Sequence, residues 1–198
     1  HKSLQTIKEE LDIFTGLRKC DGVSIAGGDP LTHPQIVEIV KMVKEKGLKP
    51  IINTNGLALT EDLLVELKKA GVYGFTFHID SKQGRPGWKD KNEIELNELR
   101  LQYADMLAEA GNISCAFNST VYEDTMQYVP EMVKWGEDNI DKVQVMVFII
   151  YRAVNNQKVD FYLGPKKIDM TQLVYNEEVQ ERTDIQANEI YELIKNKF

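Results

Sequence analysis

The feature that most constrains this chain is a regular alternation between short apolar segments and longer amphipathic segments. The apolar segments predict five strands, at residues 23–26, 50–54, 75–80, 113–121 and 143–151. Between them, apolar residues recur at the spacing of a helix that buries one face. Strands that alternate with helices form a parallel sheet with right-handed crossovers. We therefore expect an α/β fold, either an open or partial (β/α) barrel or a doubly wound sheet.

The two ends of the chain extend this pattern. Apolar residues from Leu4 to Leu17 predict an opening helix, and those in 190–194 predict a closing helix. After residue 152 the sequence is polar and loses the alternation. Because the chain starts at His1 and is helical almost at once, we expect a fragment or the ordered part of a longer protein. We expect one domain, 1–198, with the barrel core in 1–152 and an irregular excursion plus the closing helix in 153–198.

Composition excludes several classes of protein. The net charge is −7 and the pI is about 5.1, which argues against nucleic-acid binding through a basic surface. The longest apolar run, 145–151, is far shorter than the roughly 20 residues of a membrane span. No secretory signal opens the sequence. Two distant cysteines, Cys20 and Cys115, fit a reducing compartment, so we expect a cytoplasmic protein.

Polar residues stand at the end of every predicted strand. They are Gly27-Gly28-Asp29, Asn53-Thr54-Asn55, His78-Ile79-Asp80-Ser81, Asn118-Ser119-Thr120 and Arg152. A single polar strand end carries little information, because loops are solvated in any protein. In parallel α/β folds, however, ligands bind beyond the carboxyl ends of the strands. Five polar ends at one rim therefore predict a binding site there.

Strand alternation predicts which of these side chains face inward. In the segment 75–80, three apolar residues share one face and Thr76, His78 and Asp80 share the other. We expect the apolar face to meet the helices and the polar face to point into the barrel. Asn118 is preceded on its own face by small residues two and four positions earlier, which leave room for a ligand.

The strand ends resemble those of the radical S-adenosylmethionine (radical SAM) enzymes. Residues 24–31, Ser-Ile-Ala-Gly-Gly-Asp-Pro-Leu, resemble the Gly-Gly-Glu-Pro segment that follows the second strand of that family. Asn53-Thr54-Asn55-Gly56 is similar to the third strand end, and His78-Ile79-Asp80-Ser81 stands where many members have Ser-x-Asp. Asn118-Ser119-Thr120-Val121 is similar to the fifth strand end. The resemblance covers about residues 4–152, in order.

This resemblance implies a partial (β/α)6 barrel, truncated at its N-terminus, that binds S-adenosylmethionine (SAM). It assigns Asp29, in place of the commoner Glu, to the amino group of the methionine moiety, and Asn118 to the ribose. It places the adenine against the backbone near residues 146–148. The cofactor-binding residues that it implies are Gly27, Gly28, Asp29, Asn53, Thr54, His78, Asp80, Asn118, Met146 and Phe148.

The resemblance also implies a [4Fe–4S] cluster, which the family holds with a Cys-x3-Cys-x2-Cys loop after its first strand. This sequence contains neither that loop nor that strand. Cys20 does not replace the loop, because it precedes the strand at 23–26 and so lies at the wrong end of the sheet. We expect the cluster ligands upstream of His1, no metal ligand in this chain, and no activity of the chain without them.

With its cluster, a member of the family cleaves SAM to a 5′-deoxyadenosyl radical. The resemblance therefore implies an electron donor such as a flavodoxin or ferredoxin. The radical would modify a small-molecule, lipid or peptide substrate. Neither the substrate nor a catalytic residue follows from the sequence.

The long loop 81–92 follows the third predicted strand and combines Arg85, Trp88 and three lysines. One interpretation is a substrate clamp, in which Arg85 grips an anionic group and Trp88 forms an apolar wall. The other is a solvated loop with Trp88 folded onto the barrel. Arg152, after the last strand, is a third candidate substrate residue with the same ambiguity.

Two other functions fit the same residues. His78 and Asp80 could serve a metal-dependent hydrolase or lyase built on a barrel, although the chain has only three histidines. Alternatively, the chain could be a non-catalytic α/β domain that binds a small molecule. Cysteines at the family's spacing upstream of His1 would favour the first hypothesis, and a His-x-His there would favour the hydrolase.

Overall fold

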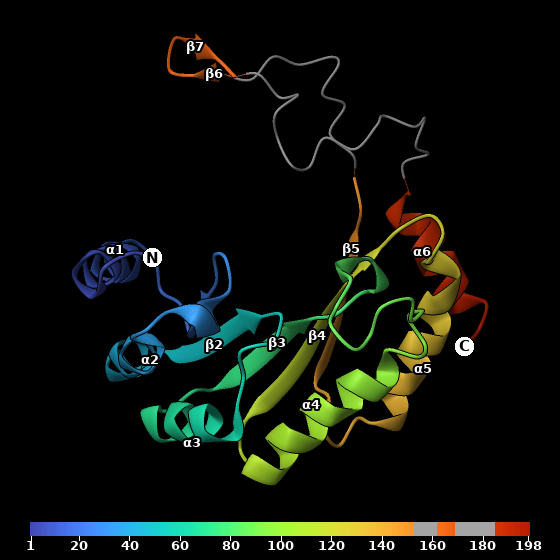
Figure 1. Ribbon diagram of the computed structural model, residues 1–198, viewed down its shortest axis with the longest axis horizontal. Helices are drawn as coiled ribbons and strands as arrows, with labels where there is room; N and C mark the ends of the chain where they lie inside the picture. Colours follow the sequence, from blue (N-terminus) through green and yellow to red (C-terminus); the bar gives the residue numbers. More distant parts are fainter. Residues whose placement is uncertain (153–161, 169–184) are drawn as a thin grey trace.

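The computed structural model of this chain describes residues 1–152, 162–168 and 185–198. Its centre is a parallel sheet with the strand order β1-β2-β3-β4-β5. These strands are β1 (Gly22–Ile25), β2 (Lys49–Thr54), β3 (Gly74–His78), β4 (Ser114–Val121) and β5 (Val145–Ile150). Because each strand pairs with the next one in sequence, the sheet is wound in one direction, which excludes the doubly wound alternative. Figure 1 shows it curled into a half-barrel, and the predicted partial barrel is confirmed.

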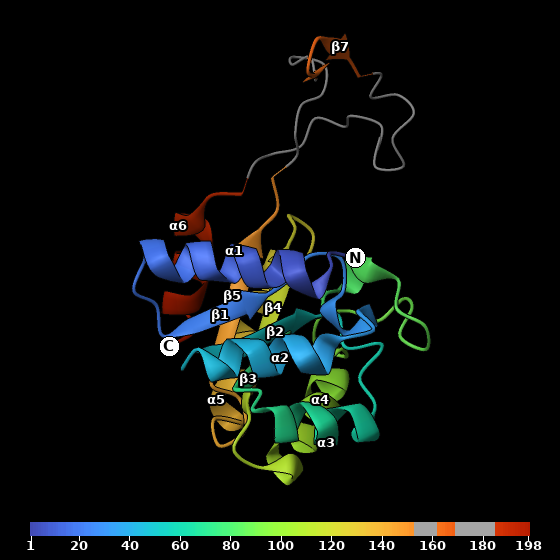
Figure 2. The ribbon, with the colours of Figure 1, turned by 90° about the vertical axis from the view of Figure 1, so that its left-hand side faces the viewer.

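Helices cover one face of this sheet. They are α1 (Leu4–Leu17), α2 (Ile36–Glu45), α3 (Glu61–Ala70), α4 (Asn97–Ala110), α5 (Val129–Asp138) and α6 (Ala187–Lys195). In Figure 1, α2 to α5 lie along the convex face of the sheet. Figure 2 shows α1 beside α2, at the β1 edge. The opposite, concave face carries the residues that alternate with the buried ones.

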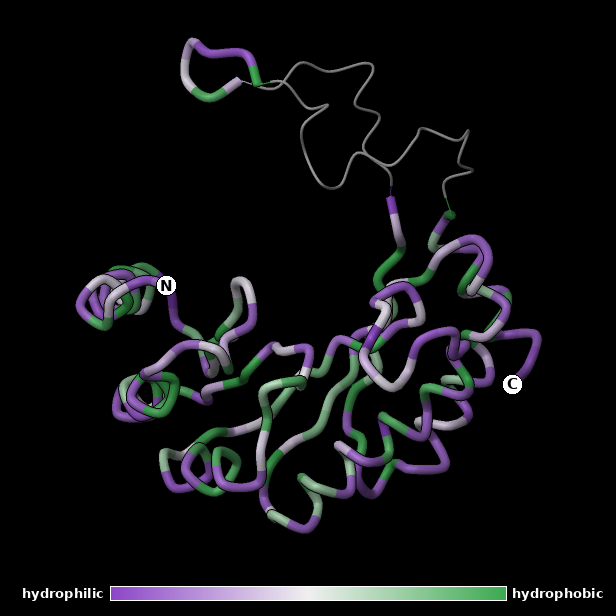
Figure 3. Tube along the Cα trace, in the orientation of Figure 1, coloured by the Kyte–Doolittle hydropathy of each residue, from purple (hydrophilic) through white to green (hydrophobic). Residues whose placement is uncertain are grey.

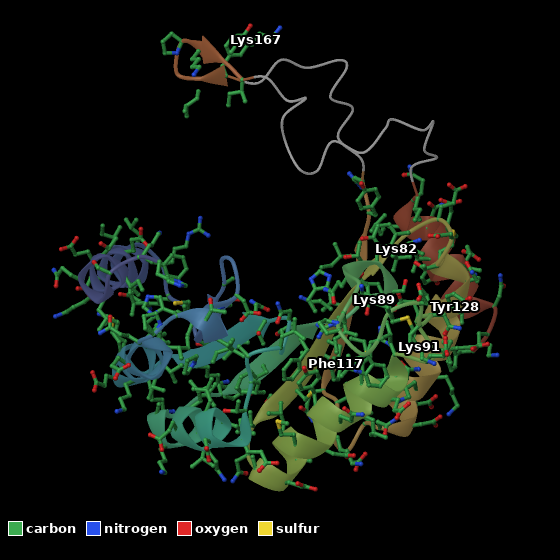
Figure 4. All side chains as sticks on the ribbon, viewed as in Figure 1. Lys82, Lys89, Lys91, Phe117, Tyr128 and Lys167 are labelled. Atoms are coloured by element: carbon green, nitrogen blue, oxygen red, sulfur yellow. The ribbon has the colours of Figure 1, made fainter. Side chains whose placement is uncertain are left out.

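Aromatic side chains fill the layer between the sheet and the helices. Phe77 stacks on Phe75, with 5.6 Å between ring centroids, and lies 5.8 Å from Phe117. Phe117, labelled in Figure 4, also meets Trp135 of α5 edge-on at 5.8 Å. Figure 3 shows the apolar residues concentrated along the strands and on one side of the helices. The prediction that the apolar residues of 75–80 face the helices is thus confirmed.

Local signals account for several helix boundaries. Thr60 caps α3 by accepting a hydrogen bond from Leu63 N at 3.2 Å, and Gly71 ends that helix in the left-handed region. A 3₁₀ turn, Pro30–Thr32, precedes α2, which begins only at Ile36.

The C-terminal helix α6 packs beside α5 and the outer strands. Val121, Val129, Ile185 and Ile190 form a small apolar cluster there, which accounts for the predicted closing helix. Two short strands, β6 (Tyr162–Leu163) and β7 (Lys166–Lys167), form a hairpin in the predicted irregular excursion. The rest of that excursion lies outside the described residues. Within the described residues, no helix is long and apolar enough to cross a membrane.

Candidate functional site

The turn after β1 presents its backbone at the carboxyl rim of the sheet. Gly27 and Gly28 adopt φ angles of +107° and +56°, in a region that residues with a side chain rarely adopt. A Cβ added to either glycine would meet no atom within 4 Å. The two glycines therefore shape the backbone, and the space beside them is open to a ligand.

Asp29 follows the glycines and joins the ends of β1 and β2. Its carboxylate accepts hydrogen bonds from Leu31 N at 3.0 Å, the Thr54 hydroxyl at 2.8 Å and Asn55 N at 2.9 Å. The bond from Leu31 begins the 3₁₀ turn Pro30–Thr32. A carboxylate has about four acceptor positions. The three donors leave one of these positions for a further donor, and the residue as a whole is half-buried.

Thr54 was predicted to bind the cofactor, but its side chain is buried and does not face the concave side of the sheet. It is 4% exposed, and its hydroxyl donates to Asp29 and accepts from Gly56 N at 2.9 Å. Strand alternation turns it away from the concave face, so its hydroxyl holds Asp29 and the turn after β2. Its neighbour Asn53 lies on the concave face instead, where its Nδ2 donates to the Ser24 hydroxyl.

The ends of β3 and β4 bring together three polar side chains. His78 Nε2 lies 3.0 Å from Asp80 Oδ2 and 3.0 Å from Thr120 Oγ1. Asp80 is 3% exposed, and its other oxygen accepts from Lys82 N at 3.1 Å. Asn118 lies opposite His78 in the strand register and is half-buried on the same face. Thr120 was not among the predicted site residues, although its position two residues after Asn118 places it on that face.

Arg85 does not form the open clamp that the loop 81–92 suggested. Its side chain is 4% exposed and donates through Nη2 to the carbonyl oxygens of Asn55 and His78, the latter at 2.6 Å. Burial lowers the pKa of this guanidinium. Trp88 is half-buried against the main core, as in the alternative of a folded loop. The loop therefore lies on the barrel and uses its arginine to bind strand ends.

The lysines of this loop lie at its outer surface. Figure 4 labels Lys82, Lys89 and Lys91 on the connection between β3 and α4. Lys82 pairs with Asp124 beyond β4, and Lys91 pairs with Glu95 at 2.7 Å. Surface pairs of this kind contribute at most about 1 kcal/mol each.

Three residues of the last strand and its end were predicted to lie at the site, and they face different ways. The side chains of Met146 and Phe148 pack toward the helices, so only their backbone is available to a ligand on the concave face. Between and beside them, Val145, Val147 and Ile149 are exposed on the concave face. Arg152 is exposed at the end of the strand.

A buried ion pair beneath the rim was missed in the sequence. Arg100 of α4 and Glu93, which precedes that helix, lie 2.8 Å apart and are 0% and 2% exposed. The sequence does contain an indication of this pair. Arg100 follows Leu96 by four positions and therefore lies on the apolar face of its helix, where a charged residue needs a buried partner. Burial lowers the pKa of Arg100, and the Glu93 carboxylate opposes that change.

A cleft of about 550 Å³ opens beside the glycine turn. Apolar residues of α1 and β1 line it, among them Ile7, Leu11, Val23 and Ile25. Gly27 and Asp29 lie at its border, so the cleft is continuous with the rim.

Neither cysteine offers a place for an iron–sulfur cluster. Cys115 is fully buried in β4, and burial raises its thiol pKa to about 12. Cys20 lies before β1, at the amino end of the sheet, beside a separate small apolar cluster. The described residues contain no group of three or more His, Cys, Asp or Glu side chains that could hold a metal. A [4Fe–4S] cluster therefore does not fit the described part of this chain, and a hydrolase metal centre at His78 and Asp80 lacks a third ligand there.

The family of the chain follows from comparison with known proteins. The family model of the radical SAM superfamily matches residues 1–136. The chain therefore belongs to the radical SAM superfamily, and the predicted resemblance is confirmed. Membership implies SAM and a [4Fe–4S] cluster as the family's cofactors.

Curated relatives share parts of this sequence. An "AdoMet-dependent heme synthase" of Methanosarcina barkeri is 38% identical over 84 residues, which are 38% of this chain and 24% of the relative. A "Putative glycyl-radical enzyme activating enzyme" of Methanocaldococcus jannaschii is 26% identical over 165 residues, which are 81% of this chain and 60% of the relative. The chain thus spans about a quarter of the first of these relatives and less than two thirds of the second.

Solved structures share the fold. SuiB of Streptococcus suis, bound to the precursor peptide SuiA, superposes with a TM-score of 0.54 at 15% identity, covering 75% of this chain and 33% of SuiB. A domain of a pyruvate-formate lyase-activating enzyme from Bacteroides vulgatus gives a TM-score of 0.52 at 12% identity, covering 90% of this chain and 95% of that domain. At these identities the likeness shows the half-barrel fold alone.

Proposed function

We propose that this chain is the SAM-binding half-barrel of a radical SAM enzyme. The observation that carries the proposal is the turn Gly27-Gly28-Asp29. Its backbone is open, and its carboxylate lies at the carboxyl rim with capacity for a further donor. A cationic amine beside this carboxylate would form a charge-assisted hydrogen bond.

The other predicted residues extend this site along the concave face. Asn53, His78 and Asn118 line it on β2, β3 and β4 and offer groups that suit hydroxyls and a carboxylate. On β5, Val147 is exposed on the same face and suits the flat apolar surface of an adenine ring. The backbone at 146–148 offers amide and carbonyl groups to the edge of that ring.

The residues described here would bind and orient the cofactor. When bound beside a reduced cluster, SAM would supply the chemistry common to the superfamily, a cleavage of its carbon–sulfur bond by one electron from that cluster. We assign to the described residues the placing of SAM and the exclusion of water from it.

We propose a small molecule, a lipid or a peptide as the substrate, and a flavodoxin or ferredoxin as the electron donor. The peptide bound to SuiB supports the peptide option within this fold. Arg152, exposed at the end of β5, and the exposed residues of the loop 81–92 are the places where we expect a substrate to contact the chain.

The proposal is tested by titrating the ¹⁵N-labelled chain with SAM to about millimolar concentration, which detects weak binding. We expect the largest amide shifts at Gly27, Gly28, Asn53 and Asn118, and no shifts in α3. S-adenosylhomocysteine, which keeps the amino acid and the adenosine, should compete. An absence of shifts, or shifts confined to other surfaces, would contradict the proposal.

A further inference from the structure

Two arginines in the segment that follows β3 are buried directly beneath the rim. Arg85 is 4% exposed and Arg100 is 0% exposed, whereas arginine is rarely buried in proteins. Among the described residues, only Arg85 Nη1 and Arg100 Nε are buried side-chain polar atoms without a hydrogen bond of acceptable geometry. The Tyr103 hydroxyl is close enough to Arg85 to influence its pKa but does not satisfy Nη1 geometrically. Each arginine therefore keeps one buried nitrogen without a hydrogen bond, although its other nitrogens are bonded.

Arg85 joins the ends of β2 and β3. Its Nη2 donates to the carbonyl oxygens of Asn55, directly after β2, and His78, the last residue of β3. Its Nε donates to Gln83 Oε1 at 2.9 Å, which holds the side chain under its own loop. Asn55 is also the residue whose N–H binds Asp29. Arg85 thus contacts both the Asp29 side of the site and the His78 side.

Arg100 joins the ends of β3 and β4. Its Nη2 donates to the Ile79 carbonyl oxygen at 3.0 Å and to the Ser119 hydroxyl at 3.1 Å. Ile79 lies between His78 and Asp80, and Ser119 lies between Asn118 and Thr120. The Ser119 hydroxyl in turn donates to the same Ile79 oxygen at 2.7 Å.

Each neighbouring pair of strand ends, from β1 to β4, is therefore joined by one charged side chain. Asp29 joins β1 to β2, Arg85 joins β2 to β3, and Arg100 joins β3 to β4. Backbone pairing of β3 with β4 continues to the bond from Ile79 N to Asn118 O at 2.9 Å, so side chains hold the strand ends together only beyond this point.

The two buried arginines are matched in number by two buried carboxylates. Arg85 and Arg100 are accompanied by the buried carboxylates of Asp80 and Glu93. A buried ion pair is a weak source of stability, because desolvation offsets the attraction between its charges. Such a pair instead requires a defined geometry of its partners.

We propose that Arg85 and Arg100 are positioning residues of the site. Arg85 fixes the Asp29–Asn55 pair relative to His78, and Arg100 fixes Asp80 relative to Thr120, beyond the last backbone bond between β3 and β4. Neither guanidinium contacts the ligand. The measurement of SAM affinity rests on the proposed function, whereas the positioning role itself can be tested without SAM.

The experiment compares two local NMR signals in the full chain. One is the pair of imidazole nitrogen shifts of His78, which report its contacts with Asp80 and Thr120. These are readily assigned, because the chain has three histidines and the other two, His1 and His33, lie together with 5.0 Å between ring centroids. The other is the exchange rate of the Asn55 amide, which reports its bond to Asp29.

The variants separate the two arginines. Arg85→Met should raise the Asn55 exchange rate by about tenfold or more, and Arg85→Lys should restore part of the protection. Arg100→Met combined with Glu93→Gln, which avoids an unpaired buried carboxylate, should shift the His78 nitrogens with little effect on Asn55. If that double variant does not fold, Arg100→Lys provides the same comparison, because it keeps the charge and loses the two-nitrogen geometry.

Leu107→Ala is the matched control, since it creates a cavity near the far end of α4 and destabilises the chain without touching the rim. Both arginine variants should weaken SAM binding by about fivefold or more, and the control should not. Local signals identical to those of the control at equal loss of stability would overturn the proposal. If the wild-type chain binds no SAM, the proposed function fails, and the two local signals still decide whether the arginines position the rim.

Discussion

Replacing Asp29 tests whether its carboxylate is a ligand for the cofactor or only a link between strands. Three donors converge on it, at 3.0 Å from Leu31 N, 2.8 Å from the Thr54 hydroxyl and 2.9 Å from Asn55 N. Asp29→Ala removes all three bonds. Asp29→Asn keeps one oxygen as an acceptor but turns an NH₂ group toward a donor.

The expected loss of unfolding free energy differs between Asp29→Ala and Asp29→Asn. A hydrogen bond to a charged group contributes about 1.5–3 kcal/mol, and a buried donor without a partner costs about 1–3 kcal/mol. Thr54 is 4% exposed and Leu31 is 6% exposed, so their donors cannot easily recover a bond from water, whereas Asn55 is half-buried. We therefore expect a loss of about 2–4 kcal/mol of unfolding free energy for Asp29→Ala and about 1–2 kcal/mol for Asp29→Asn.

Thr54→Val supplies the comparison that separates the two roles. It removes the hydroxyl and should also destabilise by about 1–2 kcal/mol, but it leaves the carboxylate in place. If the carboxylate binds the amino group of SAM, both Asp29 variants should lose about ten- to hundredfold in affinity, and Thr54→Val should lose much less.

The assay is a SAM titration followed by amide shifts, combined with urea unfolding of each variant. Asp141→Ala, which removes one charge from an exposed position before β5, controls for net charge. Affinity that follows stability alone, with Asp29→Asn and Thr54→Val equally affected, would refute the ligand role of Asp29.

Three further predictions address other parts of the site. Asn118→Ala should weaken SAM binding by about fivefold and change the unfolding free energy by less than about 0.5 kcal/mol, because no side-chain hydrogen bond within the described residues is lost. A variant that is strongly destabilised but keeps its affinity for SAM would show that Asn118 faces the helices and not the ligand. Anaerobic reconstitution of this chain, followed by iron and sulfide analysis, should give less than one [4Fe–4S] cluster per chain, and one full cluster would contradict the separation of Cys20 and Cys115. Because burial raises the pKa of Cys115 to about 12, against about 9 when unfolded, its thiol favours the folded state below pH 9, and that contribution is lost as pH rises toward 12. Cys115→Ala should therefore reduce the fall in the urea midpoint above pH 9, and a thiol reagent at pH 8 should label Cys20 much faster than Cys115 in the native chain.

Short-range patterns predicted most of the fold. Hydrophobic period distinguishes strand from helix locally, so β3 and α4 could be located from their own residues. Capping groups such as Thr60 and Gly71 also act within one turn. The turn at Gly27 and Gly28 was visible for the same reason, since the need for a positive φ is a property of the local backbone.

Contacts between distant residues could not be predicted in this way. Thr54 was placed among the ligands because it stands at a strand end, but its hydroxyl is held by Asp29, 25 residues earlier in the chain. Arg85 was expected to face a substrate, yet it binds carbonyl oxygens on two neighbouring strands. The single-direction order of the strands likewise depends on pairing across the sheet.

The sequence by itself determined the alternating elements, the rim where they end and the residue types available there, because each depends on neighbours along the chain. The tertiary structure decided which polar groups remain available to a ligand. Arg85, Arg100 and Thr54 are buried in the folded chain, and most of their donors are therefore bonded to other parts of the protein. Asn53, His78 and Asn118 stay on the concave face because strand alternation turns them away from the helices.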